Sequence, residues 1–586
     1  MQSRNLFAST LMALAVTTAT SIAAQAPSAG AAARYIVQAA TVSAANQDVA
    51  RAGGKTEQNL PIIHAVAAHL NPGQVARLRR IAGVHVFDDR SLTTEGSLLS
   101  LLSPVTSPVV MLASSLQTPT DGQGMLLPTL LYQTNYPTLV GADTLQQAGV
   151  TGKGVTIAVL DSGLWQDPVQ NYSGRLLASI DVLNGGSGTV KGDPYGHGTH
   201  VTSIAAGGAM NISGSYLSIA PRANLVVVRA FDGTGSGRYA DVIAGLNWIV
   251  ANRTKYNIRV LNLSFGATPE SYYWDDPLAQ AVMAAWRAGI VVVTAAGNEG
   301  PAAMTIDVPG NVPYVITTGA LTDNYTPYNL ADDRLASFSS AGPTYEGFVK
   351  PELVSPGGHI VASMASGSYL ANIDPLSMLL TENLFTMSGT SMAAAVTTGV
   401  VALMLQSDPA LTPDGVKCRL LASSRPAVTA QGKLAYSVFQ QGAGLINAVA
   451  AVNSSATGCA NVGLDINADL AGTQHFGGPA NKDASGNYYI MNMAGSAWGG
   501  SLASDGYTWS QGYAWNQGYS WSAGYLWSQG YTWAKGYTWA KSYTWAKGYT
   551  WAKGYTWAKS VPWWTSTGSS AVATTPASIE NWVPNQ

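Results

Sequence analysis

The feature that most restricts the fold of this chain is an alternation of short β-rich apolar runs with helix-forming stretches between about residues 136 and 456. The runs VTIAVL, NLVVVRAF and GIVVVTAA alternate with stretches such as ADVIAGLNWIVANR and PLAQAVMAAWRAG. Strands that alternate with helices form a parallel sheet with helices over both faces. We therefore expect a doubly wound α/β domain with a mostly parallel sheet, whose functional residues lie at the carboxyl ends of its strands.

The other segments of the 586-residue chain differ from this domain in composition. Residues 1–26 combine Arg4, an apolar stretch and small residues before a cleavage point, which predicts a secretory signal peptide, with an uncleaved membrane anchor as the alternative. Residues 33–90 alternate between strand-like and helix-like runs, which predicts a small α+β unit. The apolar patch at 97–116 is rich in Ser and interrupted by Pro, so we expect no membrane span there. Two linkers and a C-terminal tail complete the division, at 91–135, 457–505 and 560–586.

Three short motifs of the α/β domain contain the groups that acyl transfer requires. Asp161 follows the run VTIAVL, His197 lies in YGHGTHV, and Ser391 lies in SGTSMAA. Hydrolysis through an acyl-enzyme needs a nucleophilic hydroxyl, an imidazole to take its proton, and a carboxylate to fix the imidazole tautomer. Each motif alone is also compatible with a helix cap or a loop. Together, and in the order Asp, His, Ser, they predict a catalytic triad.

These motifs resemble the signatures of a known peptidase family. DSG, HGTHV and GTSMA resemble the three catalytic signatures of the subtilases, and LNLSFG, SFSSAGP and KPELVSPG are similar to other segments of that family. The resemblance covers roughly 136–455 and implies a subtilisin-like serine endopeptidase that acts on proteins or peptides. It implies that Asp161 orients His197, that His197 is the general base and that Ser391 is the nucleophile. His200 is expected to be a structural partner on the same helix.

The order of elements at 33–90 resembles the small βαββαβ pro-domain that precedes many subtilases. In that family the pro-domain serves as a folding template and an inhibitor. The resemblance therefore implies a secreted, extracellular enzyme that is made as an autoprocessed precursor, with its own pro-domain as an inhibitory partner.

An oxyanion hole and a substrate-binding strand are also implied by the resemblance. Asn298, in VVVTAAGNEG, matches the residue whose amide donates to the tetrahedral oxyanion, and the Ser391 backbone N–H would be the second donor. Asp307 falls where the family builds the floor of its main side-chain pocket, with Glu299 near the rim. A buried carboxylate there would favour Lys or Arg before the scissile bond; alternatively, Asp307 caps a turn and the pocket takes apolar residues. The residues expected to pair with substrate backbone are Gly235, Ser236, Gly237, Ser264, Phe265 and Gly266.

One position departs from the family pattern. Subtilases usually follow GTSMA with a small residue and then Pro, whereas this chain has Ala394 and Ala395. A proline inside a helix removes the hydrogen bond to the carbonyl four residues earlier, which here is that of Ser391. Ala395 therefore predicts an altered environment for the Ser391 carbonyl.

No cofactor is expected for the chemistry, and no metal ligands are predicted. The loop at 207–218 resembles the place of a calcium site in the family but offers no carboxylate, so structural calcium stays an open alternative. Cys418 and Cys459 are the only cysteines, which in an exported protein predicts a disulfide, with two free thiols as the alternative. The net charge of −2 gives the protein no overall positive potential that would attract nucleic acid, so no nucleic-acid partner is expected.

The segment 506–559 consists of nine six-residue units that begin as GYTWSQ and settle into GYTWAK. In an extended chain, Tyr, Trp and Lys of each unit lie on one side and Gly, Thr or Ala on the other. Such an aromatic, cationic face suits a cell-surface polysaccharide, with low-complexity disorder and self-assembly as the alternatives. The rival function for the whole chain is a non-enzymatic surface-adhesive protein that uses this aromatic repeat tail.

Overall fold

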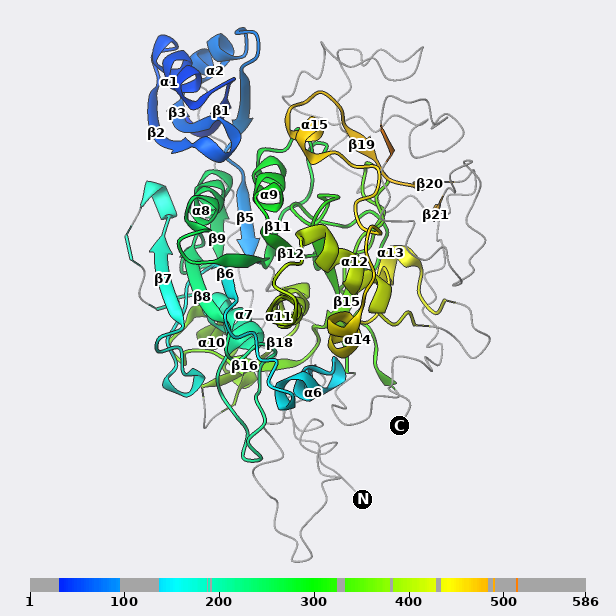
Figure 1. Ribbon diagram of the computed structural model, residues 1–586. Helices are drawn as coiled ribbons and strands as arrows, with labels where there is room; N and C mark the ends of the chain where they lie inside the picture. The colour runs from blue at the N-terminus through cyan, green and yellow to red at the C-terminus, as the bar shows by residue number, and fades with distance from the viewer. Residues whose placement is uncertain are drawn as a thin grey trace, which may run out of the picture.

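A computed structural model describes residues 31–94, 136–323 apart from 187, 190 and 191, 332–379, 383–427, 434–482, 488–490 and 513–514 (Figure 1). The predicted signal peptide, most of the first linker, most of the repeat segment and the C-terminal tail lie outside these residues. The described chain forms a small N-terminal α+β unit that is seated on a larger α/β domain.

The N-terminal unit is a four-stranded antiparallel sheet with two helices. Its elements are β1 (Ala33–Gln38), α1 (Val42–Arg51), β2 (Lys55–Leu60), η1 (Pro61–Ile63), β3 (Ala65–Leu70), α2 (Pro72–Leu78) and β4 (His85–Asp88). The strand order is β2-β3-β1-β4. Asn71 caps α2 in a reciprocal arrangement with Gln74, and Pro72 occupies the first helical position, where its missing N–H costs nothing. The unit thus has the βαββαβ order that the sequence pattern resembles.

The α/β domain is built on an eight-stranded sheet. Its strands are β6 (Thr156–Asp161), β7 (Leu176–Asp181), β8 (Asn224–Arg229), β10 (Ile258–Leu263), β12 (Val291–Ala295), β13 (Ile316–Thr322), β14 (Arg334–Leu335) and β15 (Leu353–Pro356). They lie in the order β14-β13-β12-β10-β6-β8-β7, and β15 also pairs with β13. Every pair is parallel except β13 with β14. The expected mostly parallel sheet is confirmed.

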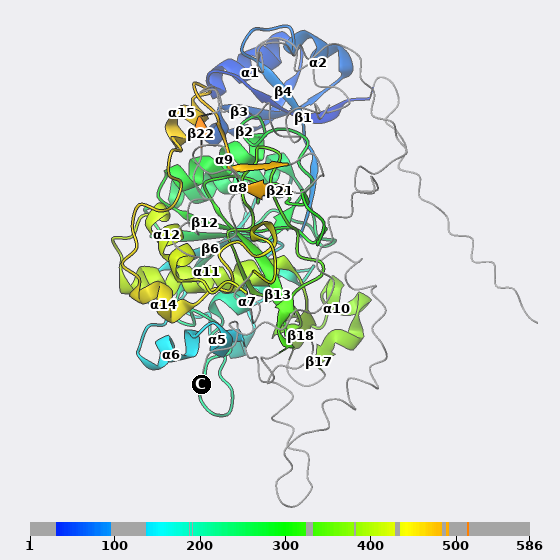
Figure 2. The ribbon, with the colours of Figure 1, turned by 90° about the vertical axis from the view of Figure 1, so that its right-hand side faces the viewer.

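Long helices cover both faces of this sheet (Figures 1 and 2). They are α7 (His197–Ala206), α8 (Tyr239–Asn252), α9 (Pro277–Arg287) and α11 (Thr390–Ser407). Helices α7 and α11 pack together on one face, and α8 packs with α9 on the other, between the sheet and the N-terminal unit. β6 lies between β8 and β10, so the strands that follow β6 in the chain are added first on one side of it and later on the other. Such a reversal opens a crevice at the carboxyl ends of the strands.

Shorter elements complete the described structure. They are β5 (Ser91–Thr94), α5 (Tyr136–Leu139), α6 (Ala142–Gln147), η3 (Pro168–Gln170), η4 (Leu183–Gly185), β9 (Ser236–Arg238), β11 (Phe265–Gly266), β16 (Ile360–Ser363), α10 (Tyr369–Ile373), η6 (Pro375–Ser377), β17 (Met378–Leu379), β18 (Leu384–Met387), α12 (Pro413–Ser423), α13 (Val438–Gln441), α14 (Ala448–Asn453), α15 (Ile466–Leu470), β19 (Phe476–Gly477), β20 (Ala480–Lys482), β21 (Tyr488–Ile490) and β22 (Tyr513–Ala514).

The described part of the segment 457–505, which the sequence predicts to be a linker, is folded against the α/β domain. Helix α15 packs against α9, and its buried Asp469 accepts hydrogen bonds from Tyr273 Oη at 2.6 Å and Tyr314 Oη at 3.0 Å. Phe476 joins the main apolar core, and β19 pairs with β22 of the second repeat unit. Polar contacts and scattered apolar residues thus hold this segment against distant parts of the chain, and neither leaves an apolar period in the sequence.

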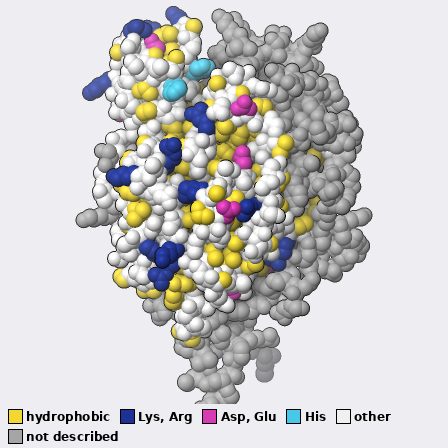
Figure 3. Space-filling view, in the orientation of Figure 1, with side chains coloured by type: hydrophobic (Ala, Val, Ile, Leu, Met, Phe, Trp, Pro, Cys, Tyr) yellow, Lys and Arg dark blue, Asp and Glu magenta, His cyan; other side chains and the backbone are white. Residues whose placement is uncertain are grey.

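On the described part of the face in Figure 3, Lys and Arg side chains lie scattered among uncharged ones, with a few Asp and Glu. Among the described residues, α11 alone is long and apolar enough to cross a membrane, and 89% of its 18-residue window is buried inside the protein. Helix α11 therefore belongs to the core, where it carries one of the predicted catalytic residues at its start.

Candidate active site

Asp161 lies at the carboxyl end of β6 and is fully buried. Its Oδ1 accepts hydrogen bonds from the Ser162 backbone N–H at 2.7 Å and from Ser162 Oγ at 3.2 Å. Ser162 Oγ in turn accepts from the Gly198 N–H at 2.9 Å, which connects the carboxylate to the first turn of α7. These bonds satisfy a buried carboxylate and fix its orientation.

His197 is the first residue of α7, and its Nδ1 lies 2.8 Å from Asp161 Oδ1 and 3.0 Å from Oδ2. Because an ionised carboxylate can only accept, Nδ1 carries the proton and Nε2 is the basic nitrogen. Asp193 holds the start of the helix, since its carboxylate accepts from Gly196 N, Thr199 N and Thr199 Oγ1 at 2.8–2.9 Å. The imidazole therefore has a fixed position and tautomer.

His200 has a different environment on the same helix. Its Nε2 lies 2.9 Å from the backbone oxygen of Phe385, and burial lowers the pKa of His200 to about 3. A neutral imidazole that donates to a backbone carbonyl is a structural group. The geometry thus places His197, and not His200, against Asp161.

Ser391 is the second residue of α11 and lies beside the carboxyl end of β10. Its Oγ donates to the Ser264 carbonyl at 3.3 Å, and Ser264 Oγ donates to the Ser391 carbonyl at 3.0 Å. Leu160 of β6 pairs with Leu263 of β10, so Asp161 and Ser264 follow neighbouring positions of adjacent strands. Ser391 and the Asp161–His197 pair therefore gather at one edge of the sheet.

Asn298 follows β12 in the loop next to Ser391. Its Oδ1 accepts from the Thr390 N–H at 3.0 Å and from Thr390 Oγ1 at 3.1 Å, while Thr390 Oγ1 accepts from the Gly297 N–H at 3.2 Å. This network turns the amide oxygen toward Thr390, so the NH₂ group of Asn298 is the end that can donate to an oxyanion.

Both predicted substrate-binding segments pair with an extended strand of the chain itself. β5 lies between β9 and β11 and is antiparallel to both. Thr93 pairs with Gly266 and Ser236, Leu92 pairs with Gly237, Thr94 pairs with Phe265, and the Thr94 N–H donates to the Gly235 carbonyl at 3.1 Å. Gly235 has φ +78° and Tyr195 packs where a Cβ would lie, so a side chain there would be strained and would clash. The groove between β9 and β11 can therefore hold an extended peptide.

Asp307 lies directly behind the loop that carries Asn298. Its side chain is buried, and a Cβ added to Gly297 would lie 2.9 Å from Asp307 Oδ2. Val308, the next residue, pairs with Ala267 just after β11. Glu299 is exposed, and its N–H donates to Ser340 Oγ at 3.1 Å. The structure thus brings Asp307 to the oxyanion loop and leaves Glu299 at the surface.

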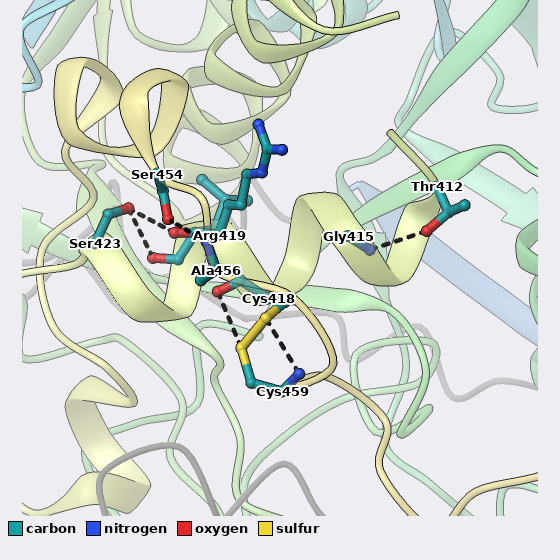
Figure 4. The surroundings of a disulfide bond; sticks show 9 residues. Thr412, Gly415, Cys418, Arg419, Ser423, Ser454, Ala456 and Cys459 are labelled. Carbon is teal, nitrogen blue, oxygen red and sulfur yellow. Dashed lines mark hydrogen bonds between the residues drawn. A yellow bond between two sulfur atoms is a disulfide. The ribbon is translucent and has the colours of Figure 1, made fainter. Parts of the chain in front are cut away.

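The two cysteines form a disulfide between α12 and the C-terminal segment (Figure 4). Cys418 and Cys459 are joined with a Cα–Cα distance of 5.1 Å. Among the residues that the structure describes, no group of three or more His, Cys, Asp or Glu side chains could hold a metal ion. Structural calcium at 207–218 stays an alternative that the sequence does not support with an evident ligand set.

Sequence reasoning missed the residues that hold the predicted groups in place. Ser162, Asp193 and Thr390 orient Asp161, His197 and Asn298 respectively. Asp193 had a signal in the sequence, because an Asp a few residues before a helix is a common cap. Thr390 had none, since its partner Asn298 is 92 residues away.

Comparisons with known proteins agree with this geometry. A family model described as the subtilase family matches residues 152–444. The serine protease AprX of Bacillus subtilis (strain 168) is 42% identical over 280 residues, which are 46% of this chain and 60% of AprX. Subtilisin DY of Bacillus licheniformis is 30% identical over 315 residues, which are 53% of this chain and 96% of that protein. The crystal structure of fervidolysin from Fervidobacterium pennivorans, a keratinolytic enzyme, matches with a TM-score of 0.56 at 21% identity, over 80% of this chain and 66% of fervidolysin.

Proposed function

The chain belongs to the subtilase family, and we propose that this subtilisin-like serine endopeptidase is a secreted precursor whose N-terminal unit inhibits it until the chain cuts itself. The observation that carries the catalytic assignment is the contact of His197 Nδ1 with both oxygens of Asp161, at 2.8 and 3.0 Å. The relatives' names support secretion, because they include subtilisins and an extracellular serine proteinase.

In the first step Ser391 Oγ bonds to the carbonyl carbon of a peptide, and its proton passes to His197 Nε2. The carbonyl electron pair moves to oxygen, where the Asn298 amide and the Ser391 N–H donate to the negative charge. The positive end of α11 favours the same charge. The imidazolium then protonates the leaving nitrogen, the C–N bond breaks, and an acyl-enzyme remains.

In the second step His197 takes a proton from water, and the resulting hydroxide adds to the acyl carbon. The same donors stabilise the second oxyanion. Collapse of this intermediate returns the proton to Ser391 Oγ and releases the new carboxyl terminus. Asp161 keeps the imidazole in place and stabilises its cationic form in both steps.

The pairing of β5 supports self-processing. Ser91–Thr94 occupies the groove between β9 and β11 as a peptide substrate would. Thr94 pairs with Phe265, and Ser264, the residue before Phe265, accepts the Ser391 hydroxyl hydrogen bond. From the register up to Thr94, we propose the bond between Glu95 and Gly96 as the site of self-cleavage. Glu95 and Gly96 themselves lie outside the described residues.

The contacts of the N-terminal unit with α8 support an inhibitory role. Arg34 of β1 forms ion pairs with Asp89 at 3.2 Å and with Asp241, in the first turn of α8, at 3.0 Å. Asp89 Oδ1 also accepts from the Ala240 N–H at 2.8 Å, so it binds the positive end of α8. Ile36 and Leu92 share the main apolar core with the α/β domain. The N-terminal unit thus anchors itself beside the groove that β5, the strand directly after this unit, occupies.

Expression of the full chain with Ser391→Ala tests this function. The variant is expected to lack proteolysis and to keep its N-terminal unit, whereas the natural chain is expected to yield a product that begins at Gly96. Edman sequencing or mass spectrometry of both secreted products reads the result. Maturation of the variant in a host without a substituting protease would contradict self-processing.

Labelling of the matured chain with a serine-directed phosphonate tests catalysis separately. An enzyme is expected to be labelled once, at Ser391, whereas a non-enzymatic adhesive would stay unlabelled. A cell-surface polysaccharide remains the proposed partner of the repeats at 506–559. Retention of the matured chain on cell-wall polysaccharide, lost when 506–559 is deleted, would support that partner.

A further inference from the structure

Lys417 of α12 places its ammonium group in a buried oxygen cage, although its side chain is only 1% exposed. The five oxygens belong to three consecutive backbone carbonyls, one amide side chain and one carboxylate. Their distances from Nζ are 2.8 Å for Pro313 O, 3.2 Å for Tyr314 O, 3.2 Å for Val315 O, 3.0 Å for Asn461 Oδ1 and 2.8 Å for Glu352 Oε1.

The hydrogen bonds that Lys417 donates do not by themselves explain this arrangement, in which Tyr314 O also accepts from Asn461 Nδ2 and Val315 O from Lys350 Nζ, each at 3.1 Å. A lysine ammonium has three hydrogens, so at most three of the five oxygens can receive a well-directed hydrogen bond. Several oxygens that converge on one positive centre, with backbone carbonyls among them, are instead the environment that proteins give to hard metal cations. Lys417 thus stands where a cation would be coordinated.

The cage is fixed by partners other than Lys417. Asn461 lies two residues after Cys459, so the disulfide to Cys418 holds it beside α12, and its Nδ2 donates to Asp414 Oδ1 at 2.7 Å. Glu352 Oε2 accepts from the Thr317 N–H at 2.8 Å. Lys350 Nζ lies 2.7 Å from Glu352 Oε1. Because these bonds do not involve Lys417, the oxygens should keep their positions when its side chain is shortened.

We propose that these five oxygens form a cation site that Lys417 fills with its own ammonium group, and that the site takes a free monovalent cation when the lysine side chain is removed. Without Lys417 the charges of Glu352 and Lys350 cancel, which leaves little attraction for a divalent ion. The distances of 2.8–3.2 Å to Nζ also exceed the 2.3–2.6 Å that calcium requires. Ammonium and potassium ions are therefore the fitting ligands.

The position of the cage gives the cation a structural task near the active site. The loop that supplies Pro313, Tyr314 and Val315 begins only a few residues after Asp307, which backs the oxyanion loop. The cation gathers this loop, the strand that carries Glu352 and the disulfide segment that carries Asn461 around one point. Its loss should loosen all three together.

Thermal unfolding of the full chain tests the proposal, with Ser391→Ala present in every sample to prevent self-digestion. Lys417→Ala is expected to lower the midpoint by about 5–15 °C, because it removes one of the two buried ammonium groups that face Glu352 and leaves a cavity among the five oxygens. Ammonium chloride or potassium chloride at about 0.5 M should restore a third or more of that loss by binding only the folded state. Tetramethylammonium chloride at the same concentration should restore none of it, because its methyl groups prevent close approach of the oxygens.

Two control variants separate a filled site from a general effect of salt. Lys417→Met removes the charge but keeps the volume of the side chain, so it should be destabilised and should not respond to ammonium. Lys153→Ala removes an exposed lysine and should respond to all salts as the Ser391→Ala chain does. Equal stabilisation of Lys417→Ala by the three salts, or rescue of Lys417→Met by ammonium, would overturn the proposal.

A second variant covers the case in which Lys417→Ala does not fold in any salt. Lys417→Ser leaves nearly the same space as Lys417→Ala and adds a hydroxyl that can donate to one cage oxygen, so it should fold more readily and should gain the same stability from ammonium or potassium. Stabilisation of Lys417→Ser by ammonium and not by tetramethylammonium would support the oxygen cage as a cation site. Failure of both variants to fold with any cation would refute it.

Discussion

Thr390→Val is expected to slow catalysis indirectly, because Thr390 holds the side chain of Asn298 in place. Valine has nearly the shape of threonine, so the change removes the hydroxyl and little else. Asn298 Oδ1 then loses one of its two donors from Thr390, Oγ1 at 3.1 Å, and keeps the backbone N–H at 3.0 Å. The Gly297 N–H also loses its acceptor at 3.2 Å. The Asn298 amide is therefore still present but less firmly directed toward the oxyanion.

The size of the effect follows from the number of bonds lost. One hydrogen bond contributes about 0.5–1.5 kcal/mol net, which corresponds to a factor of about 2–12 in rate when it acts only in the transition state. Complete removal of such an oxyanion donor from a subtilisin lowers kcat by about 10²–10³, which sets the upper limit. We expect kcat to fall about tenfold and KM to stay within about twofold, because the oxyanion exists only after attack.

Steady-state kinetics on a chromogenic peptide measures this change in a double-mutant cycle with Asn298→Ala. Thr390→Ser keeps the hydroxyl and should retain most of kcat. Thr397→Val is a matched control, because it removes another buried threonine hydroxyl from α11. The hydroxyl of Thr397 forms a 2.7 Å hydrogen bond with Ser355 Oγ and none with Asn298. Thr390→Val should cost nothing further once Asn298 is Ala. An equal loss in both backgrounds, or a loss confined to KM, would refute the reasoning.

Four other outcomes are expected. Asn298→Ala should lower kcat by roughly 10²–10³ with little change in KM, and an effect on KM alone would exclude it from the oxyanion hole. If Asp307 shapes the main pocket, peptide-library profiling should show Lys and Arg enriched before the cleaved bond, and Glu95→Lys should mature faster than Glu95→Leu; equal rates would exclude this role. Burial lowers the pKa of His200 to about 3 from 6.5, so the unfolded chain binds an extra proton as pH falls from about 6.5 to 3 and stability is lost in that window; His200→Gln, in urea unfolding of the Ser391→Ala chain, should show a weaker pH dependence there, and an unchanged slope would contradict it. Ala395→Pro should change kcat, or the partition of the acyl-enzyme between water and an added amine, more than it changes the melting temperature, and equal turnover and transfer in both forms would contradict that.

The sequence predicted the parts of this enzyme that leave a local signature. Each triad residue lies in a short motif at a strand end or a helix start, and the parallel sheet places such ends at one edge. Asp161 and His197 are 36 residues apart in sequence, yet strand β6 and helix α7 bring them to 2.8 Å. The groove segments also had a signal, because Gly235 and Gly237 allow close approach of a backbone.

The supporting polar contacts could not be predicted in the same way. Thr398 Oγ1 donates to Asn262 Oδ1 at 2.8 Å across 136 residues, and Asn262 Nδ2 donates to Ser264 Oγ at 2.8 Å. Such a pair has no period and no spacing that distinguishes it from other Thr and Asn residues. The cage around Lys417 is of the same kind, since three of its oxygens are backbone carbonyls that every sequence contains.

The sequence also did not predict how far the folded structure extends beyond the expected domains, for a related reason. The segment after Cys459 has few apolar residues, and its buried Asp469 gains its place from Tyr273 and Tyr314, which precede it by more than 150 residues. Similarly, Ser91–Thr94 is Ser- and Thr-rich like the rest of the expected linker. It becomes a strand only because β9 and β11 offer unpaired edges on both sides. Long-range pairing, and not local propensity, decides the structure of both segments.

The Ser391 carbonyl lies where a local feature of helix α11 meets a contact with a residue distant in the sequence. Ala395 restores the helical N–H that a proline would remove, so this carbonyl can accept from the helix as well as from Ser264 Oγ at 3.0 Å. Ser264 Oγ is itself held by Asn262, and the Ser264 carbonyl accepts from Ser391 Oγ at 3.3 Å. Any shift at the start of α11 must therefore move either the nucleophile or the residue next to the substrate strand. We therefore expect residue 395 to affect catalysis through the Ser391 and Ser264 carbonyls, which no sequence motif connects.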